Sequence, residues 1–114
     1  MANCTGTNVV YSKKEDCMAA CKAMPEGKAD DKTSNTAYCR AYHADVAKGD
    51  PDTHCPHAGV SSSADTCGSP CDGYCDQVTA NCTGANAQHK DKAECMTWCN
   101  GRPAGKWNDT AGDT

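Results

Sequence analysis

The sequence contains no Phe, Leu or Ile, and these absences exclude an ordinary hydrophobic core. Its larger apolar side chains amount to five Val, four Met, four Tyr and two Trp in 114 residues. Burying Ala and a few Val yields too little transfer free energy to offset the conformational entropy that folding costs. Another kind of interaction must therefore hold the fold together.

Basic patches, long apolar runs and catalytic signatures are also missing. The formal net charge is -4, so we expect no nucleic-acid partner. No apolar segment is long enough for a membrane span or an export signal, and any export signal must lie outside this numbering. The C-x-x-C redox motif, a Ser/His/Asp pattern and a glycine-rich phosphate loop are all absent. The sequence predicts a protein that is not an enzyme.

Eleven cysteines stand in place of the missing apolar residues. At this density in a short acidic chain, cysteines usually form a disulfide framework, in which each bridge contributes about 2 to 4 kcal/mol. Such bridges persist in oxidising compartments. We therefore expect an extracellular or cell-surface location.

The segment NCTG occurs twice and opens a longer repeat. Residues 3–36 align without a gap on residues 81–114, with 14 of 34 positions identical, including all three cysteines. The sequence therefore predicts tandem 78-residue repeats. We expect residues 1–36 to be part of a preceding unit and residues 37–114 to be one full period.

Two of the three predicted helices carry C-x3-C motifs. Ser69 as N-cap and Pro70 at the first helical position begin one helix, which is predicted to end near Gly84. Asp91 begins the other with a capping-box pattern, and that helix is predicted to end near Gly101. In the upstream copy, Ser12 and Glu15 are predicted to form the same capping box.

A third helix is predicted in TAYCRAYHADVAKG, with Cys39, Tyr42, His43 and Val46 on one face. The next segment, DPDTHCPHAGVSSSADTCG, contains two prolines and a serine run and is predicted to be an irregular loop. The expected fold class is a small, mainly α, disulfide-rich protein. It combines a short helical hairpin with a third helix and long loops, in tandem 78-residue repeats.

The spacing of the two C-x3-C motifs predicts two bridges. Residues i and i+4 share a helix face, so antiparallel helices would pair Cys71 with Cys99 and Cys75 with Cys95. This arrangement resembles the twin C-x3-C helical hairpins of small oxidised proteins of the mitochondrial intermembrane space. The resemblance concerns local geometry only.

The remaining pairings stay open at this point. Cys39, Cys55, Cys67 and the NCTG cysteine, which is Cys4 or Cys82, allow three combinations. One bridge from the third helix to the loop, and another from the NCTG cysteine to the rest of the fold, are favoured.

The odd number of cysteines has two interpretations. Cys17 and Cys21 compete with Cys95 and Cys99 for a single partner motif. Either the chain is a fragment with free thiols, or Cys17 and Cys21 pair with a neighbouring copy. A head-to-tail contact of that kind does not close and builds a fibre. We therefore predict a structural or interaction protein whose partner is itself.

Three histidines form the densest group of metal-binding side chains. His54 and His57 lie on either side of Cys55, and His43 lies on the preceding helix. Imidazole nitrogens bind zinc, copper and haem iron. A metal- or haem-binding extracellular module is therefore the alternative to a purely structural role, for which no cofactor is expected.

NCTG, C-x3-C, CRAYH and HCPHAG together resemble cysteine-rich modules of exported bacterial proteins. The similarity extends over the 78-residue unit. Those modules have no assigned function, so the resemblance implies an exported protein and leaves the activity open.

Overall fold

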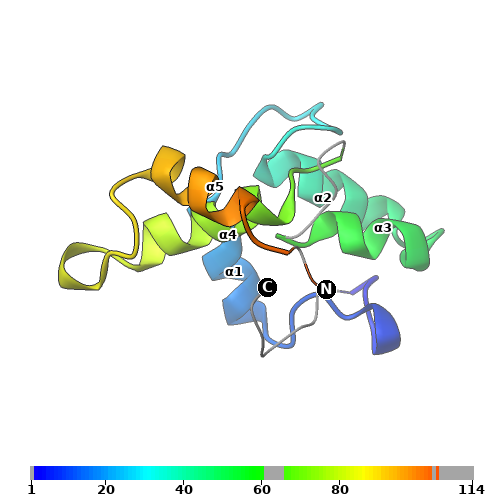
Figure 1. Ribbon diagram of the computed structural model, residues 1–114. Coiled ribbons are helices and arrows are strands. Elements are labelled where there is room, and N and C mark those ends of the chain that lie inside the picture. Colours follow the sequence, from blue (N-terminus) through cyan, green and yellow to red (C-terminus); the bar gives the residue numbers. More distant parts are fainter. Residues whose placement is uncertain (1, 61–65, 104, 106–114) are drawn as a thin grey trace.

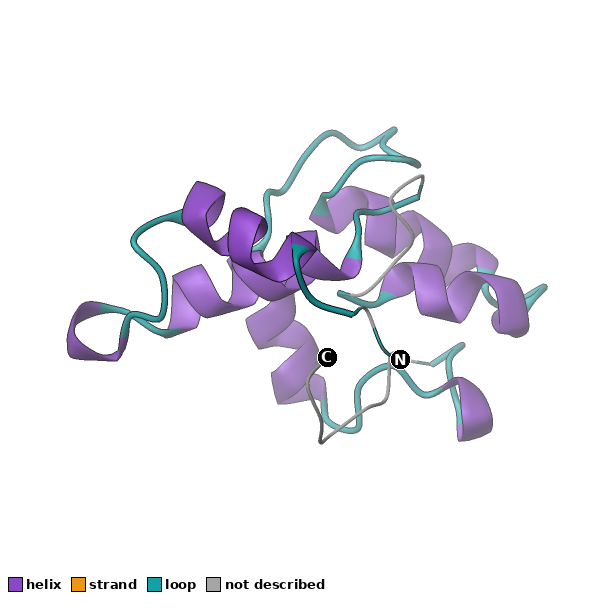
Figure 2. Ribbon diagram, in the orientation of Figure 1, coloured by secondary structure: helices purple, strands orange, loops and turns teal. Residues whose placement is uncertain are grey.

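The protein is a small assembly of short helices in the computed structural model, which describes residues 2–60, 66–103 and 105. These residues form five α-helices and two 3-10 helices and contain no β-strand (Figure 2). The elements are η1 (Gly6–Asn8), α1 (Lys14–Ala23), α2 (Ala37–Val46), α3 (Pro51–Ala58), α4 (Pro70–Asn81), η2 (Gly84–Asn86) and α5 (Lys92–Asn100). The predicted fold class, small and mainly α, is confirmed.

The helices form two contacting pairs, with α1 added to one of them. Figure 1 shows α2 and α3 side by side, while α4 carries α5 along one side and α1 against another. The 3-10 helix η1 lies against α3. Residues 1–36, the predicted partial repeat, therefore contact both pairs through η1 and α1.

Helix α4 begins as the sequence predicts. The Ser69 Oγ accepts a hydrogen bond from the Asp72 amide at 3.2 Å, and the Asp72 carboxylate accepts one from the Ser69 amide at 3.0 Å. This reciprocal capping box satisfies two amides that the first helical turn would leave unpaired. The helix ends at Asn81, three residues before the predicted stop at Gly84.

The two copies of the second predicted helix begin differently. In α5 the Asp91 carboxylate accepts from the Glu94 amide at 2.9 Å, and the helix ends at Asn100 with Gly101 as its C-cap, close to the predicted end. In α1 the N-cap is Lys13, whose side chain makes no capping hydrogen bond. The predicted Ser12 cap is therefore wrong, because the alignment places Lys13, one residue later, at the position of Asp91.

The two NCTG segments share one backbone conformation. Each continues into a 3-10 helix, and the glycine that opens it has a positive φ, +60° at Gly6 and +58° at Gly84. The glycines two residues after Pro25 and Pro103, which are aligned in the repeat, match as well, with φ of +79° at Gly27 and +67° at Gly105. Only glycine adopts this region without strain, which accounts for its presence in both copies.

Helix α2 buries a different face from the predicted one. Thr36 caps it by accepting from the Cys39 amide at 3.1 Å. Cys39 and His43 are buried as expected, but Tyr42 remains 37% exposed and Arg40 is only 5% exposed. The buried face is therefore rotated toward Arg40, whose guanidinium finds backbone carbonyl acceptors there.

The segment predicted to be an irregular loop contains helix α3. Its N-cap, Asp50, accepts from the Thr53 amide at 3.3 Å, and Pro51 occupies the first turn, where no amide donor is needed. Pro56 lies inside the helix, but in an element of eight residues it removes only one backbone hydrogen bond. The serine run at 61–65 lies outside the described residues.

Sulfur takes the place of a hydrocarbon core. The five largest side chains that are fully buried are all cysteines, namely Cys39, Cys55, Cys67, Cys75 and Cys95. By contrast, Met18 and Trp98 are 46% and 45% exposed. The apolar part of the interior therefore consists of cystine and alanine, as the composition requires.

Arg40 joins α2 to the end of α3. Its Nε donates to the Gly59 carbonyl at 2.8 Å and its Nη2 to the Val60 carbonyl at 3.5 Å. A third donor, Nη1, reaches the Thr36 carbonyl at 3.2 Å. Burial lowers the pKa of this guanidinium, and its hydrogen bonds to carbonyl groups compensate for the lost water.

Candidate metal centre and disulfide framework

Two disulfides clamp α4 to α5 in the predicted order. Cys71 is bonded to Cys99 and Cys75 to Cys95, with Cα atoms 5.7 and 5.8 Å apart. These separations are typical of a disulfide between facing helices. The hairpin is therefore fixed covalently at two successive turns.

The other two disulfides correspond to one of the three cysteine pairings that the sequence left open. Cys39 is bonded to Cys67, which ties α2 to the segment preceding α4. Cys4 is bonded to Cys55, which ties the NCTG segment to α3 across 51 residues. This last bridge connects the predicted partial repeat, residues 1–36, to the predicted full period.

Three cysteines are unpaired, and two of them are on α1. Cys17 is half-buried and Cys21 is exposed, and the third, Cys82, is half-buried at the end of α4. Helix α1 contacts α4 without a covalent bond, and the Gln77 side chain donates to the Ala20 carbonyl at 3.1 Å. Of the two C-x3-C motifs that could pair with Cys71 and Cys75, the motif of α5 forms the disulfides and the motif of α1 does not.

Three imidazoles converge between α2 and α3. His43 comes from α2 and is 7% exposed, whereas His54 and His57 lie one helical turn apart on α3. One ring nitrogen of each residue lies within 4.8 Å of the others. The three histidines predicted from the sequence are therefore brought together, because α3 is a helix that presents positions i and i+3 on one face.

Both ring nitrogens of His43 have defined neighbours. Nε2 lies 3.1 Å from the Lys32 carbonyl oxygen, and Nδ1 lies 3.1 Å from the Nδ1 of His54. A carbonyl oxygen can only accept, so Nε2 carries the proton in the neutral ring. The lone pair of His43 is therefore on Nδ1 and points toward His54.

His57 completes the group with an unsatisfied nitrogen. Its ring meets that of His43 edge to face, with centroids 5.0 Å apart. Its Nδ1 is buried and has no hydrogen-bond partner among the described residues. Burial lowers the pKa of His57, and the neighbouring His43 and His54 lower it further. The lowered pKa extends the neutral form of the ring, the form that binds metals, to lower pH.

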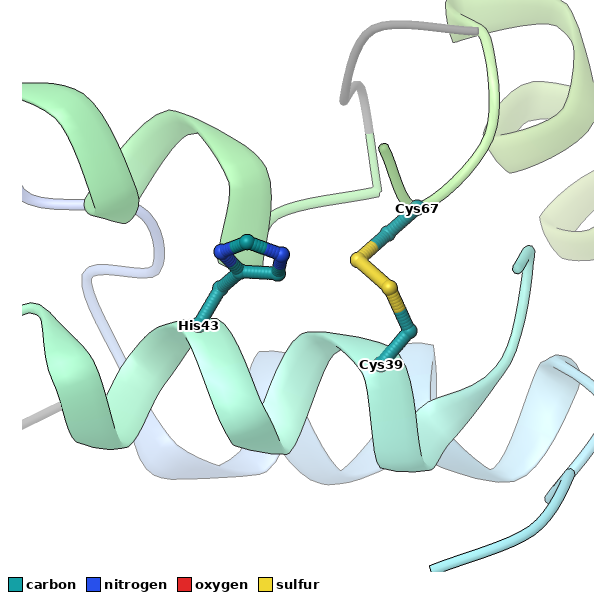
Figure 3. A group of neighbouring side chains, drawn as sticks. All are labelled: Cys39, His43 and Cys67. Atoms are coloured by element: carbon teal, nitrogen blue, oxygen red, sulfur yellow. A yellow bond between two sulfur atoms is a disulfide. The ribbon is translucent and has the colours of Figure 1, made fainter. Parts of the chain in front are cut away.

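A second group of possible ligands shares His43 but cannot use its sulfurs. Figure 3 shows His43 one turn along α2 from Cys39, whose side chain is bonded to that of Cys67. Ligand atoms of these three residues also lie within 4.8 Å of one another. Because both sulfurs are part of a disulfide, neither can act as a thiolate ligand, and the imidazoles are the available donors.

His89 lies apart from this group, beside α4 and α5. Its Nε2 is 3.3 Å from the Tyr74 hydroxyl, and its ring centroid is 5.3 Å from that of Trp98. The guanidinium of Arg102 lies over the Trp98 ring, 4.8 Å from its centroid. His89 therefore offers a histidine outside the three-histidine group for comparison.

The fold and the bridges define a small helical domain that is stapled by four disulfides. The chain belongs to the BfoA family: the BfoA family C-terminal domain matches residues 1–72. Relatives include the aurasperone B biosynthesis cluster protein A of Aspergillus niger and the bifonsecin B biosynthesis cluster protein A of Aspergillus brasiliensis. Each is 39% identical over 57 residues. No solved structure matches.

The matched segments cover 49% of this chain and only 19% of each relative. These relatives are fungal, whereas the sequence motifs suggested exported bacterial modules. A cysteine-rich domain is compatible with these matches. Within the described residues, no helix combines the length and the apolar character needed to cross a membrane.

Proposed function

We propose that the chain is a structural module of an extracellular tandem array, in which neighbouring units are joined covalently through cysteines. An interior made of cystine requires an oxidising compartment, which supports an extracellular location. The relatives extend far beyond the matched segment, so there is room in such proteins for more than one module.

The observation that carries this proposal is the position of the unpaired cysteines within the 78-residue period. Cys82 occupies the place of Cys4, and Cys4 is bonded to Cys55. If the repeat continues, Cys82 should therefore bond to the residue that is equivalent to Cys55 in a following unit. A bridge at that position would join two consecutive units.

The same relation holds for the cysteines of α1. Cys17 and Cys21 occupy the places of Cys95 and Cys99, which are bonded to the C-x3-C motif of α4. Their assigned partners are the C-x3-C cysteines of a preceding unit. In such an array each of the three unpaired cysteines would find its partner at the equivalent position one period away, which would account for their odd number.

Joining units within one chain is favoured over a fibre of separate copies. In a separate copy, the partner that Cys82 requires is already bonded to Cys4, and the motif that α1 requires is already bonded to α5. A fibre would therefore have to exchange existing bridges. Consecutive units of one chain need no exchange.

An extended chain tests the array directly. Residues 37–114 would be appended once more after Thr114, which holds the place of Thr36 in the period. Peptide mapping under non-reducing conditions should then find Cys82 bonded to the added Cys55 equivalent. The number of titratable thiols should remain three, since the added unit brings its own unpaired Cys82 equivalent.

The matched control is the same extended chain with Cys82→Ser, in which the added Cys55 equivalent should become a free thiol. Non-reducing electrophoresis of the original chain should show a single monomer band. A ladder that collapses on reduction would support a fibre of copies instead. A titratable Cys82 in the extended chain would overturn the array.

A further inference from the structure

We propose that His43, His54 and His57 form a binding site for a divalent transition metal that prefers nitrogen ligands, of the class of Zn²⁺ and Cu²⁺. The site lies between α2 and α3 and is independent of the unpaired cysteines. It would give the module a ligand in addition to a structural role.

The spacing of the closest pair already suits a metal. Two nitrogens bound to a tetrahedral zinc at about 2.0 to 2.1 Å are about 3.3 Å from each other. The Nδ1 atoms of His43 and His54 are 3.1 Å apart. One ring nitrogen of each of the three residues lies within 4.8 Å of the other two, so a modest side-chain rotation of His57 closes the set.

The hydrogen bond of His43 matches the usual support of a metal-bound histidine. Metal-ligating imidazoles donate their second ring N–H to a carbonyl or carboxylate, which fixes the tautomer and the ring orientation. His43 donates its Nε2–H to the Lys32 carbonyl and directs its Nδ1 lone pair into the group. This ligand is therefore oriented before any ion binds.

The tautomer of His54 must change when the ion binds. Since His43 Nδ1 can only accept, the Nδ1 of His54 carries the proton in the 3.1 Å contact. Ligation through that nitrogen requires the proton to move to Nε2, and because His54 is half-exposed, water can mediate this exchange. One nitrogen loses a proton as the other gains one, so the step needs no net loss of a proton.

The unsatisfied nitrogen of His57 argues for a ligand rather than a purely structural histidine. A buried polar atom without a partner costs about 1 to 3 kcal/mol. The Nδ1 of His57 is such an atom among the described residues, and it lies beside two other imidazoles. A metal ion would satisfy it through coordination.

The donor set selects the class of ion. Three neutral imidazoles suit Zn²⁺ and Cu²⁺, whereas Mg²⁺ and Ca²⁺ prefer carboxylate and carbonyl oxygens. Three protein ligands leave a fourth position for water or another small molecule. Two axial ligands of haem iron would have to lie on opposite faces of a macrocycle, about 4 Å apart, and the 3.1 Å contact of His43 and His54 leaves no space for one.

Calorimetric titration of the oxidised chain with Zn²⁺, Cu²⁺ and Mg²⁺ tests the site. The titrations use the variant Cys17→Ser/Cys21→Ser/Cys82→Ser, so that no free thiolate contributes to binding. We expect one Zn²⁺ or Cu²⁺ per chain and no Mg²⁺. In this background His57→Ala and His54→Ala should each weaken binding at least tenfold, while His89→Ala should leave it unchanged.

A second measurement guards against loss of fold. His57→Ala should keep the helical circular dichroism and all four bridges, since the Nδ1 of His57 makes no hydrogen bond that the variant could break. Bound Co²⁺ should show visible absorption that is absent in His57→Ala. Absence of stoichiometric binding, or binding that His89→Ala weakens as much as His57→Ala does, would overturn the site. The array test has a different readout, so either proposal can fail alone.

Discussion

Gly73 of α4 lies directly against the carbonyl oxygen of Val60, so closely that a methyl group at position 73 would overlap that oxygen. The segment that leaves α3 therefore passes over α4 at a point where only a hydrogen atom fits. This contact brings the α2–α3 pair and the α4–α5 pair together.

Gly73→Ala should destabilise the protein despite the higher helix propensity of alanine. The gain from propensity is at most about 1 kcal/mol, whereas overpacking against the backbone costs about 1 to 3 kcal/mol. Denaturant unfolding with intact disulfides measures the difference. Gly49→Ala is the control, because its nearest neighbour outside the adjacent chain, the Val46 carbonyl oxygen, would be 3.8 Å from the new methyl group. Equal stability of the two variants would contradict the close contact.

Removing the bridge between the NCTG segment and α3 should cost more than removing thiols from α1. Cys4→Ser/Cys55→Ser opens a loop of 51 residues, for which the chain-entropy relation gives about 4 kcal/mol. Cys17→Ser/Cys21→Ser removes no bridge and should change the free energy of unfolding by less than about 1 kcal/mol. Denaturant unfolding measures both, and a reversed order would show that α1 is covalently attached in solution.

Arg40→Lys should destabilise the junction of α2 and α3. The lysine amine cannot reproduce the set of hydrogen bonds that the guanidinium makes to the carbonyls of Thr36, Gly59 and Val60. We expect a loss of about 2 to 4 kcal/mol in the free energy of unfolding, because buried carbonyls lose their donors. The exposed Arg102→Lys is the control and should change it by less than about 1 kcal/mol. A small effect at position 40 would mean that water replaces the guanidinium.

Tyr11 should ionise late in an alkaline titration. Burial raises its pKa from 10.0 to about 12, and the nearby Cys17 thiolate contributes in the same direction. The folded-state pKa lies above the unfolded one, so this stabilisation is complete below pH 10.0 and is lost as the pH rises toward about 12. Tyrosinate absorbance in the near ultraviolet should show a late step, which Tyr11→Phe removes. If the late absorbance step persisted in Tyr11→Phe, another tyrosine would be responsible for it.

The sequence was sufficient to predict the α4–α5 hairpin and its two bridges. Positions i and i+4 fix which side chains share a helix face, and antiparallel packing then leaves one way to pair them. Ser69 and Pro70 added a local signal at the start of α4. Each of these relations spans a few residues and depends little on the rest of the fold.

Helix α3 could not be predicted in the same way. Pro51 and Pro56 indicate a break, and the segment has almost no apolar residues to show a helical period. Its stability comes from distant partners, namely the bridge from Cys4 to Cys55 and the guanidinium of Arg40 at its end. The three histidines were identified from their positions in the sequence, but their convergence depends on this helix.

A fold that is held together by disulfides leaves most of its surface residues free to vary during evolution. The two copies of the repeated segment differ at 20 of 34 positions and yet begin with the same turn and continue into the same helix. Distant members of such a lineage should therefore be recognisable by the intervals between their cysteines and glycines long after other similarity has faded.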